Sequence, residues 1–211
     1  PDHVPGTTID RQCGSSQQAV HFAAQGVMSG TSDLIVAGGV QQMSTIPISS
    51  SMLVGDQFGY PDPFSGSLGW QERYGDQEVS QFRSAQMIAD KWDCSRDEME
   101  SFAVESHERA IRARAEGRFD AEIAPFGEVM ADEGPREPNW DKIRSLRPLE
   151  EGGTITAAVA SQISDASAAL LIASEQAVED HGLTPRARIH HLSVRADDPV
   201  WMLTAPMPAT R

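Results

Sequence analysis

The sequence has 211 residues, 39% hydrophobic and 23% charged, which is the composition of an ordinary soluble globular protein with one or two domains. Its formal net charge of -14 argues against nucleic acid and membrane surfaces as partners, because no basic stripe is present to replace phosphate counterions. The two cysteines, Cys13 and Cys94, show no disulfide or zinc spacing, and residues 1–6 show no targeting signal. We therefore expect a cytoplasmic protein without a metal site.

Cys13 is the first candidate for chemistry. It stands where an extended segment, residues 7–9, gives way to small residues and then a helical pattern, so it lies at or just before a helix N-terminus. Unpaired N–H groups and the positive end of the helix dipole stabilise a thiolate there, which makes Cys13 a candidate nucleophile. Position alone also fits an inert core cysteine. The helix has no charged residue between Arg11 and Asp33, so we expect it to be buried.

The chain then changes character twice. Residues 34–37 form a short apolar run before Gly38-Gly39, typical of a strand buried on both faces, and with the helix they predict an α/β layer. Residues 45–69 are a long stretch of turns and short segments whose aromatic residues indicate a folded excursion. Glycine and proline mark its turns, namely Pro47, Gly55, Gly59, Pro61, Pro63, Gly66 and Gly69.

Two amphipathic helices are predicted next. Apolar residues recur at helical spacing between Val79 and Trp92, and Ser95 with Glu98 forms a capping box that opens a second helix, which Gly117 ends. Cys94, at the junction, has acidic neighbours and is interpreted as structural. The expected inner face of the second helix is Met99, Phe102, Ala103, Ala110 and Ala113.

The last third of the sequence begins with a polar, irregular stretch, residues 118–151, with Ile123 and Phe126 as expected anchors. Residues 168–173 predict another buried strand, residues 175–181 a helix closed by Gly182, and residues 188–194 a strand.

Two stretches carry a family resemblance. Cys13-Gly14-Ser15-Ser16-Gln17-Gln18-Ala19, followed by residues 33–44, resembles the nucleophile region of the thiolases, the acyl-CoA C-acyltransferases, and of the bacterial degradative members most. Ser16 stands where Gly is usual and Gln41 where Glu is usual. Residues 152–165 resemble the thiolase segment along the pantetheine arm of coenzyme A.

The resemblance implies a partial thiolase fold of the α/β class. Residues 1–44 and 152–184 would belong to the N-terminal half, residues 45–151 to an inserted loop domain that covers the coenzyme, and residues 185–211 to the start of the C-terminal half. Thiolases are homodimers or homotetramers, so the same assembly is expected.

The resemblance also implies the chemistry. Cys13 would attack a 3-oxoacyl-CoA and carry the acyl group until coenzyme A removes it, giving acetyl-CoA and a shortened acyl-CoA. Ala157 and Ser161 match positions along the pantetheine arm, and Arg136 matches an Asp-Glu-x-x-Arg motif beside the adenine. Coenzyme A is a substrate, and no permanently bound cofactor is expected. Beside Arg136, a basic patch could serve the phosphates or be a solvated charged face, and it comprises Lys142, Arg144 and Arg147.

Three functional hypotheses remain open. The first is a thiolase whose activating histidine and second catalytic cysteine lie in motifs that we expect after residue 211. The isolated chain is therefore expected to be inactive in thiolysis. None of the six histidines fits that motif, and each is interpreted as helix surface, strand face or loop. The second hypothesis is a non-catalytic module that binds coenzyme A or a subunit. The third, a cysteine hydrolase, lacks a recognisable histidine motif.

Overall fold

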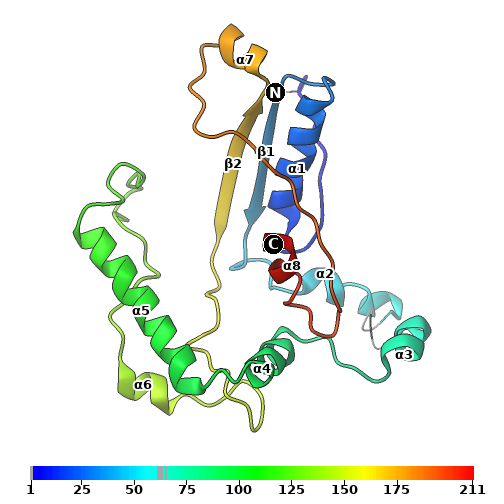
Figure 1. Cartoon of the computed structure of the whole chain (residues 1–211), viewed down its shortest axis with the longest axis vertical. Coiled ribbons are helices and arrows are strands. Elements are labelled where there is room, and N and C mark those ends of the chain that lie inside the picture. Colours follow the sequence, from blue (N-terminus) through cyan, green and yellow to red (C-terminus); the bar gives the residue numbers. More distant parts are fainter. Residues whose placement is uncertain (1, 61–63, 65) are drawn as a thin grey trace. The chain divides into compact units, whose positions relative to one another are not determined.

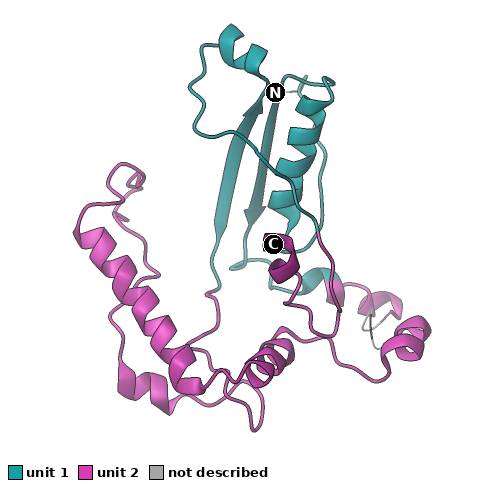
Figure 2. Cartoon of the chain, in the orientation of Figure 1, with its two compact units in different colours: residues 1–51, 163–194 teal, residues 52–162, 195–211 magenta. Residues whose placement is uncertain are grey.

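The computed structural model describes residues 2–60, 64 and 66–211 (Figure 1). The chain divides into two compact units, coloured separately in Figure 2. Unit 1 comprises residues 1–51 and 163–194, and unit 2 comprises residues 52–162 and 195–211. The four segments expected from the family resemblance have other boundaries than these two units. The assignment of those segments to the parts of a thiolase stays a prediction.

Unit 1 is a helix packed on a two-stranded sheet, as the predicted α/β layer requires. It contains α1 (Ser15–Met28), β1 (Leu34–Gln41), β2 (Ala166–Ala173) and α7 (Glu175–Asp180). The strands are antiparallel, and their register runs from Leu34 opposite Ala173 to Gln41 opposite Ala166. Figure 1 shows α1 lying along this sheet. The described sheet contains only β1 and β2. Residues 188–194 were expected to be a strand but pair with neither of them, and residues 7–9, expected to be extended, also lie outside the sheet.

One face of this sheet is covered and the other is open. Ile35, Ala37 and Gly39 are buried or half-buried, whereas Val36 and Val40 are 71% and 80% exposed. This alternation follows from the pleat, which turns successive side chains to opposite faces. In the described unit α1 covers only one face, so the expected burial of β1 on both faces is not met, and β2, also expected to be buried, is exposed from Ala166 to Leu171.

Helix α1 is likewise buried on one side. His21, Ala23 and Ala24 are buried, but Phe22 is 53% and Met28 67% exposed, so the fully buried helix expected from its lack of charge is not what forms. His21 was expected at a helix surface, a strand face or in a loop, and instead it is buried on α1.

Unit 2 is helical. The short helix α2 (Ser50–Leu53) begins at the boundary between the units and is followed by η1 (Asp56–Phe58) and α3 (Leu68–Tyr74). These short elements confirm the predicted excursion of turns, in which Pro61 and Pro63 lie outside the described residues. The longer helices are α4 (Gln81–Lys91) and α5 (Arg96–Ala115), and the unit also contains α6 (Trp140–Ser145) and α8 (Pro206–Thr210).

The boundaries of α5 confirm the predicted signals, and of its expected inner face Met99, Ala103, Ala110 and Ala113 are half-buried. Ser95 and Glu98 form the capping box, and Gly117 follows the helix with a left-handed φ of 70°. Phe102, expected inside, is 75% exposed, while Glu100 and Val104 are buried. The face turned inward is the one that carries Glu100, whose charge has a partner in Arg96.

The stretch between residues 118 and 151 also departs from expectation. It contains the unpredicted helix α6, and Phe126, expected as an anchor, is 86% exposed in a tight turn closed by hydrogen bonds to Val129. No helix in the described part of the chain is both long enough and apolar enough to cross a membrane.

Candidate active site

Cys13 lies on a tight turn immediately before α1, as predicted. Gln12 adopts a left-handed φ of 49°, a conformation that non-glycine residues rarely adopt. The N–H of Gly14 donates to the carbonyl of Arg11 at 3.0 Å, and no side chain caps the helix at Gly14. The Cys13 thiol is free and exposed. The turn thus presents a thiol at the positive end of a 14-residue helix.

A ring of hydrogen bonds fixes this turn. Ser15 Oγ donates to the carbonyl of Gln12 at 2.7 Å and accepts from the N–H of Arg11 at 2.8 Å. Asp10 Oδ1 accepts from the N–H of Gln12 at 3.0 Å. Because these contacts hold the residues on both sides of Cys13, they stabilise the strained conformation at Gln12.

Cys13 borders a hollow of about 780 Å³ within unit 1. The walls come from residues 7–16, the end of β1, residues 43–51 and the start of β2. Hydroxyl groups such as those of Ser15 and Ser16 mix there with apolar side chains such as Val40 and Ile46. The hollow therefore offers an accessible nucleophile beside a mixed polar and apolar wall.

Asp165 precedes Ala166, a residue that lines the hollow. Ser44 donates to its carboxylate twice, from the hydroxyl at 2.5 Å and from the backbone N–H at 2.8 Å. The Ser44 hydroxyl, and after it the Ser44 N–H, hold the pKa of Asp165 below its usual value. This contact joins Ser44, which follows β1, to Asp165, which precedes β2. Their neighbours Met43 and Ala166 line the hollow.

The predicted coenzyme residues lie in unit 2, whereas Cys13 lies in unit 1. Arg136, Ala157 and Ser161 are all exposed. Their two loops touch, because the side-chain amide of Gln162 donates to the carbonyl of Gly134 at 3.4 Å. The structure thus brings the segment of Arg136 to the segment of Ser161.

Two side chains that hold these loops were missed in the sequence. Gln86 of α4 accepts through Oε1 from the N–H groups of Thr154 and Ile155 at 2.7 and 3.2 Å. His107 of α5 accepts through Nδ1 from the N–H of Arg136 at 3.4 Å. A glutamine and a histidine on helices give no sequence signal for such contacts, since the partners are more than 25 residues away.

Comparison with known proteins then identifies the family. The family described as "Thiolase, N-terminal domain" matches residues 1–176. The chain belongs to the thiolase family. It is 60% identical over 215 residues to the "Steroid 3-ketoacyl-CoA thiolase FadA6" of Mycobacterium tuberculosis, a match that covers 100% of this chain and 53% of that protein.

More distant thiolases match over the same full extent of the chain. It is 35% identical to the "3-oxoadipyl-CoA/3-oxo-5,6-dehydrosuberyl-CoA thiolase" of Escherichia coli K12, covering 57% of that protein. It is 34% identical to a "3-ketoacyl-CoA thiolase" of Idiomarina loihiensis, covering 54% of it. The chain thus spans about half the length of the curated relatives it matches. The predicted family is confirmed, and the hydrolase hypothesis loses its support.

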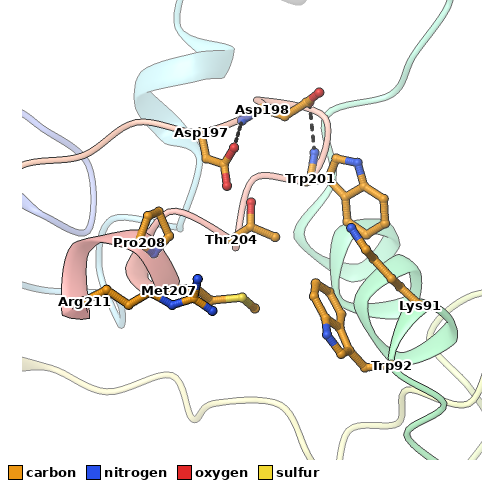
Figure 3. A pocket seen from close by; sticks show the side chains of 9 residues that line it. All are labelled: Lys91, Trp92, Asp197, Asp198, Trp201, Thr204, Met207, Pro208 and Arg211. Atoms are coloured by element: carbon orange, nitrogen blue, oxygen red, sulfur yellow. Dashed lines mark hydrogen bonds between the residues drawn. The ribbon is translucent and has the colours of Figure 1, made fainter.

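This thiolase chain also contains a second hollow, of about 400 Å³, within unit 2 (Figure 3). The Lys91 ammonium lies 4.8 Å from the ring centroid of Trp92 and 4.6 Å from that of Trp201. A bond from the Thr204 hydroxyl, then the Asp198 N–H and the charge of Lys91, lower the pKa of Asp197. These contacts hold the segment that begins at Asp197 against the C-terminal end of α4. They account for the position of the hollow, and we assign it no ligand.

Proposed function

We propose that this chain carries the nucleophile and part of the coenzyme site of a thiolase that cleaves 3-oxoacyl-CoA. The observation that carries the proposal is the placement of Cys13, exposed on a left-handed turn before α1 and beside the hollow of about 780 Å³. A catalytic cysteine must be accessible and its thiolate stabilised, and a helix start supplies that stabilisation.

The reaction has two steps. The Cys13 thiolate attacks the C3 carbonyl carbon of the substrate, the bond between C2 and C3 breaks, and its electron pair becomes the enolate of acetyl-CoA, which a proton then quenches. The thiol of a second coenzyme A next attacks the acyl-cysteine and gives up its proton, which replaces the one that the enolate took up, and the bond between the acyl carbon and the Cys13 sulfur breaks to release the shortened acyl-CoA and the Cys13 thiolate. The backbone N–H of Cys13 is suited to donate to the oxyanion during both steps.

The residues that we assign to coenzyme A are Arg136, Ala157 and Ser161. Arg136 would meet the adenine end, while Ala157 and Ser161 would line the pantetheine arm. The contact between Gln162 and Gly134 supports this assignment, because it places the two loops side by side. A cytoplasmic homodimer or homotetramer is part of the same proposal.

The 60% identical relative is named a steroid 3-ketoacyl-CoA thiolase, so a steroid-derived 3-oxoacyl-CoA is the first substrate to test. The chain would be joined to the second half of that relative, and coenzyme-dependent cleavage would be followed by release of acetyl-CoA. We expect turnover that Cys13→Ser abolishes and Cys94→Ser leaves intact. Turnover in the Cys13→Ser protein would refute the proposed nucleophile. Coenzyme binding without any acyl transfer would favour the non-catalytic module.

A further inference from the structure

Glu100 is a buried charge in the second turn of α5. Its side chain is 3% exposed, and Oε1 accepts from Arg96 Nε at 2.7 Å one helical turn earlier. A buried carboxylate persists only where a partner compensates its desolvation, and removing that partner is strongly destabilising. No sequence signal distinguishes Glu100, since an (i, i+4) pair on a helix is usually a surface feature.

The other end of the same guanidinium reaches α6. Arg96 Nη2 donates to the carbonyls of Ile143, Arg144 and Leu146 at 3.3, 3.1 and 2.9 Å. These carbonyls lie at the C-terminal end of α6, where a helix leaves its last acceptors unpaired and where a cation is favourable. Arg96 therefore links the end of α6 to α5.

The segment fixed in this way carries the basic patch. Lys142 and Arg147 are exposed, and the Arg144 guanidinium lies 5.1 Å from the Trp140 ring centroid and 3.9 Å from Asp97. Arg144 is thus turned toward Trp140 and Asp97 although its side chain is 66% exposed, and Lys142 and Arg147 are the other exposed cations of the segment. An anion that binds them needs the backbone between them held still.

We propose that Arg96 and Glu100 are a positioning pair that holds residues 142–147 so that Lys142 and Arg147 meet the phosphates of coenzyme A. This inference rests on the proposed function. Glu100 orients the guanidinium, and the guanidinium pairs the carbonyls at the end of α6. A lysine cannot replace Arg96, because the ammonium lacks the planar fork that serves Glu100 and the carbonyls together.

The same helix offers a matched control. Arg109 and Glu105 form an ion pair at the same spacing and at 2.5 Å, but their side chains are 66% and 55% exposed. An exposed pair of this kind contributes little. Substitutions in this exposed pair change the charge of α5 in the same way as the matching substitutions at Arg96 and Glu100. They leave the bonds from Arg96 to α6 in place.

The test compares Arg96→Lys and Glu100→Gln with Arg109→Lys and Glu105→Gln in the 211-residue chain. Backbone hydrogen exchange at residues 140–147, the Kd for coenzyme A, and the alkylation rate of Cys13 would be measured. In the Arg96 and Glu100 variants we expect about tenfold faster exchange and about tenfold weaker binding, as loss of a charge-assisted hydrogen bond predicts. The control variants should change both by less than about twofold. Cys13 alkylation should not change in any of the four.

A double variant, Arg96→Met with Glu100→Leu, guards against unfolding by an uncompensated charge, because removing both members of a buried pair is often tolerated. We expect it to fold, yet to show the same fast exchange and weak binding. Unchanged exchange or unchanged coenzyme affinity in the double variant would overturn the positioning role. If the wild-type chain does not bind coenzyme A, both this positioning role and the coenzyme part of the proposed function are overturned. Acylation of Cys13 would still test the nucleophile of the proposed function separately.

Discussion

Gly39 of β1 packs directly against Ser16 in the first turn of α1. A methyl group built on Gly39 would overlap Ser16 Oγ and lie 3.2 Å from Ser16 Cβ. With a larger residue at position 39 the Ser16 hydroxyl would have to rotate and the Ser16 Cβ would have to move by a few tenths of an ångström, so the lack of a side chain there favours the close packing of the helix start that carries Cys13. Ser16 itself stands where thiolases usually have glycine, which makes the fit tighter here.

Gly39→Ala should therefore destabilise the chain by about 1–3 kcal/mol, the usual effect of overpacking, and slow the alkylation of Cys13. Adding Ser16→Gly should restore most of both losses, because it removes the hydroxyl that the new methyl group meets. Gly6→Ala is the control, since no atom lies within 4 Å of the added carbon. Equal effects of Gly39→Ala with and without Ser16→Gly would show that this contact does not set the turn.

The two thiols should differ in reactivity although both are exposed. Cys13 lies before α1, whereas Cys94 lies beside Asp93, Asp97 and Glu98, and its thiol donates to the carbonyl of Trp92 at 3.8 Å. Negative neighbours disfavour a thiolate, so Cys13 should react with iodoacetamide several-fold faster near neutral pH. Peptide mapping of a time course would measure both rates in one sample. Faster labelling of Cys94 would contradict the assignment.

Asp165 should give unit 1 a pH-dependent stability. Ser44 lowers the pKa of Asp165 from 3.8, so the ionised form is favoured in the folded chain. The resulting stabilisation is fully present above the unfolded pKa, and it is lost as the pH falls through the lower folded pKa. Ser44→Ala should raise the Asp165 pKa toward its unperturbed value, which side-chain carboxyl NMR would measure. An Asp165 pKa that is the same in both proteins would rule out this contribution.

The open face of the sheet should promote association. Val36 and Val40 are 71% and 80% exposed and Leu171 is 50% exposed, and together they form an apolar patch on adjacent strands. Val40→Lys should shift the chain toward monomer in analytical ultracentrifugation. Val4→Lys, at a 60% exposed site outside the strands, should not. An unchanged sedimentation profile for Val40→Lys would show that this face is not the one that associates.

The local signals in the sequence predicted much of the fold. Ser95 and Glu98 predicted the start of α5, Gly117 its end, and the run of residues 168–173 predicted β2, because caps and apolar runs act over a few residues. The placement of Cys13 before α1 came from the same kind of signal.

What could not be predicted depends on distant partners. On α5, Arg96 bonds to carbonyls 47–50 residues away and Glu100 is buried, whereas Phe102 is 75% exposed although it is apolar. The pairing of β1 with β2 joins Leu34 to Ala173, which no local periodicity encodes. Residues 188–194 have strand-like composition, but a strand also needs a ladder to join.

Acylation of Cys13 is the most direct test of the central claim. The 211-residue chain, joined to the second half of its 60% identical relative, would be incubated with a 3-oxoacyl-CoA but no free coenzyme A, quenched in acid and digested, and its peptides would be analysed by mass spectrometry. We predict an acyl adduct on the peptide that contains Cys13, no adduct after Cys13→Ser, and none on Cys94. An acyl group on Cys94 would contradict the proposed nucleophile. So would the absence of an acyl group on Cys13 in a sample in which iodoacetamide still alkylates Cys13.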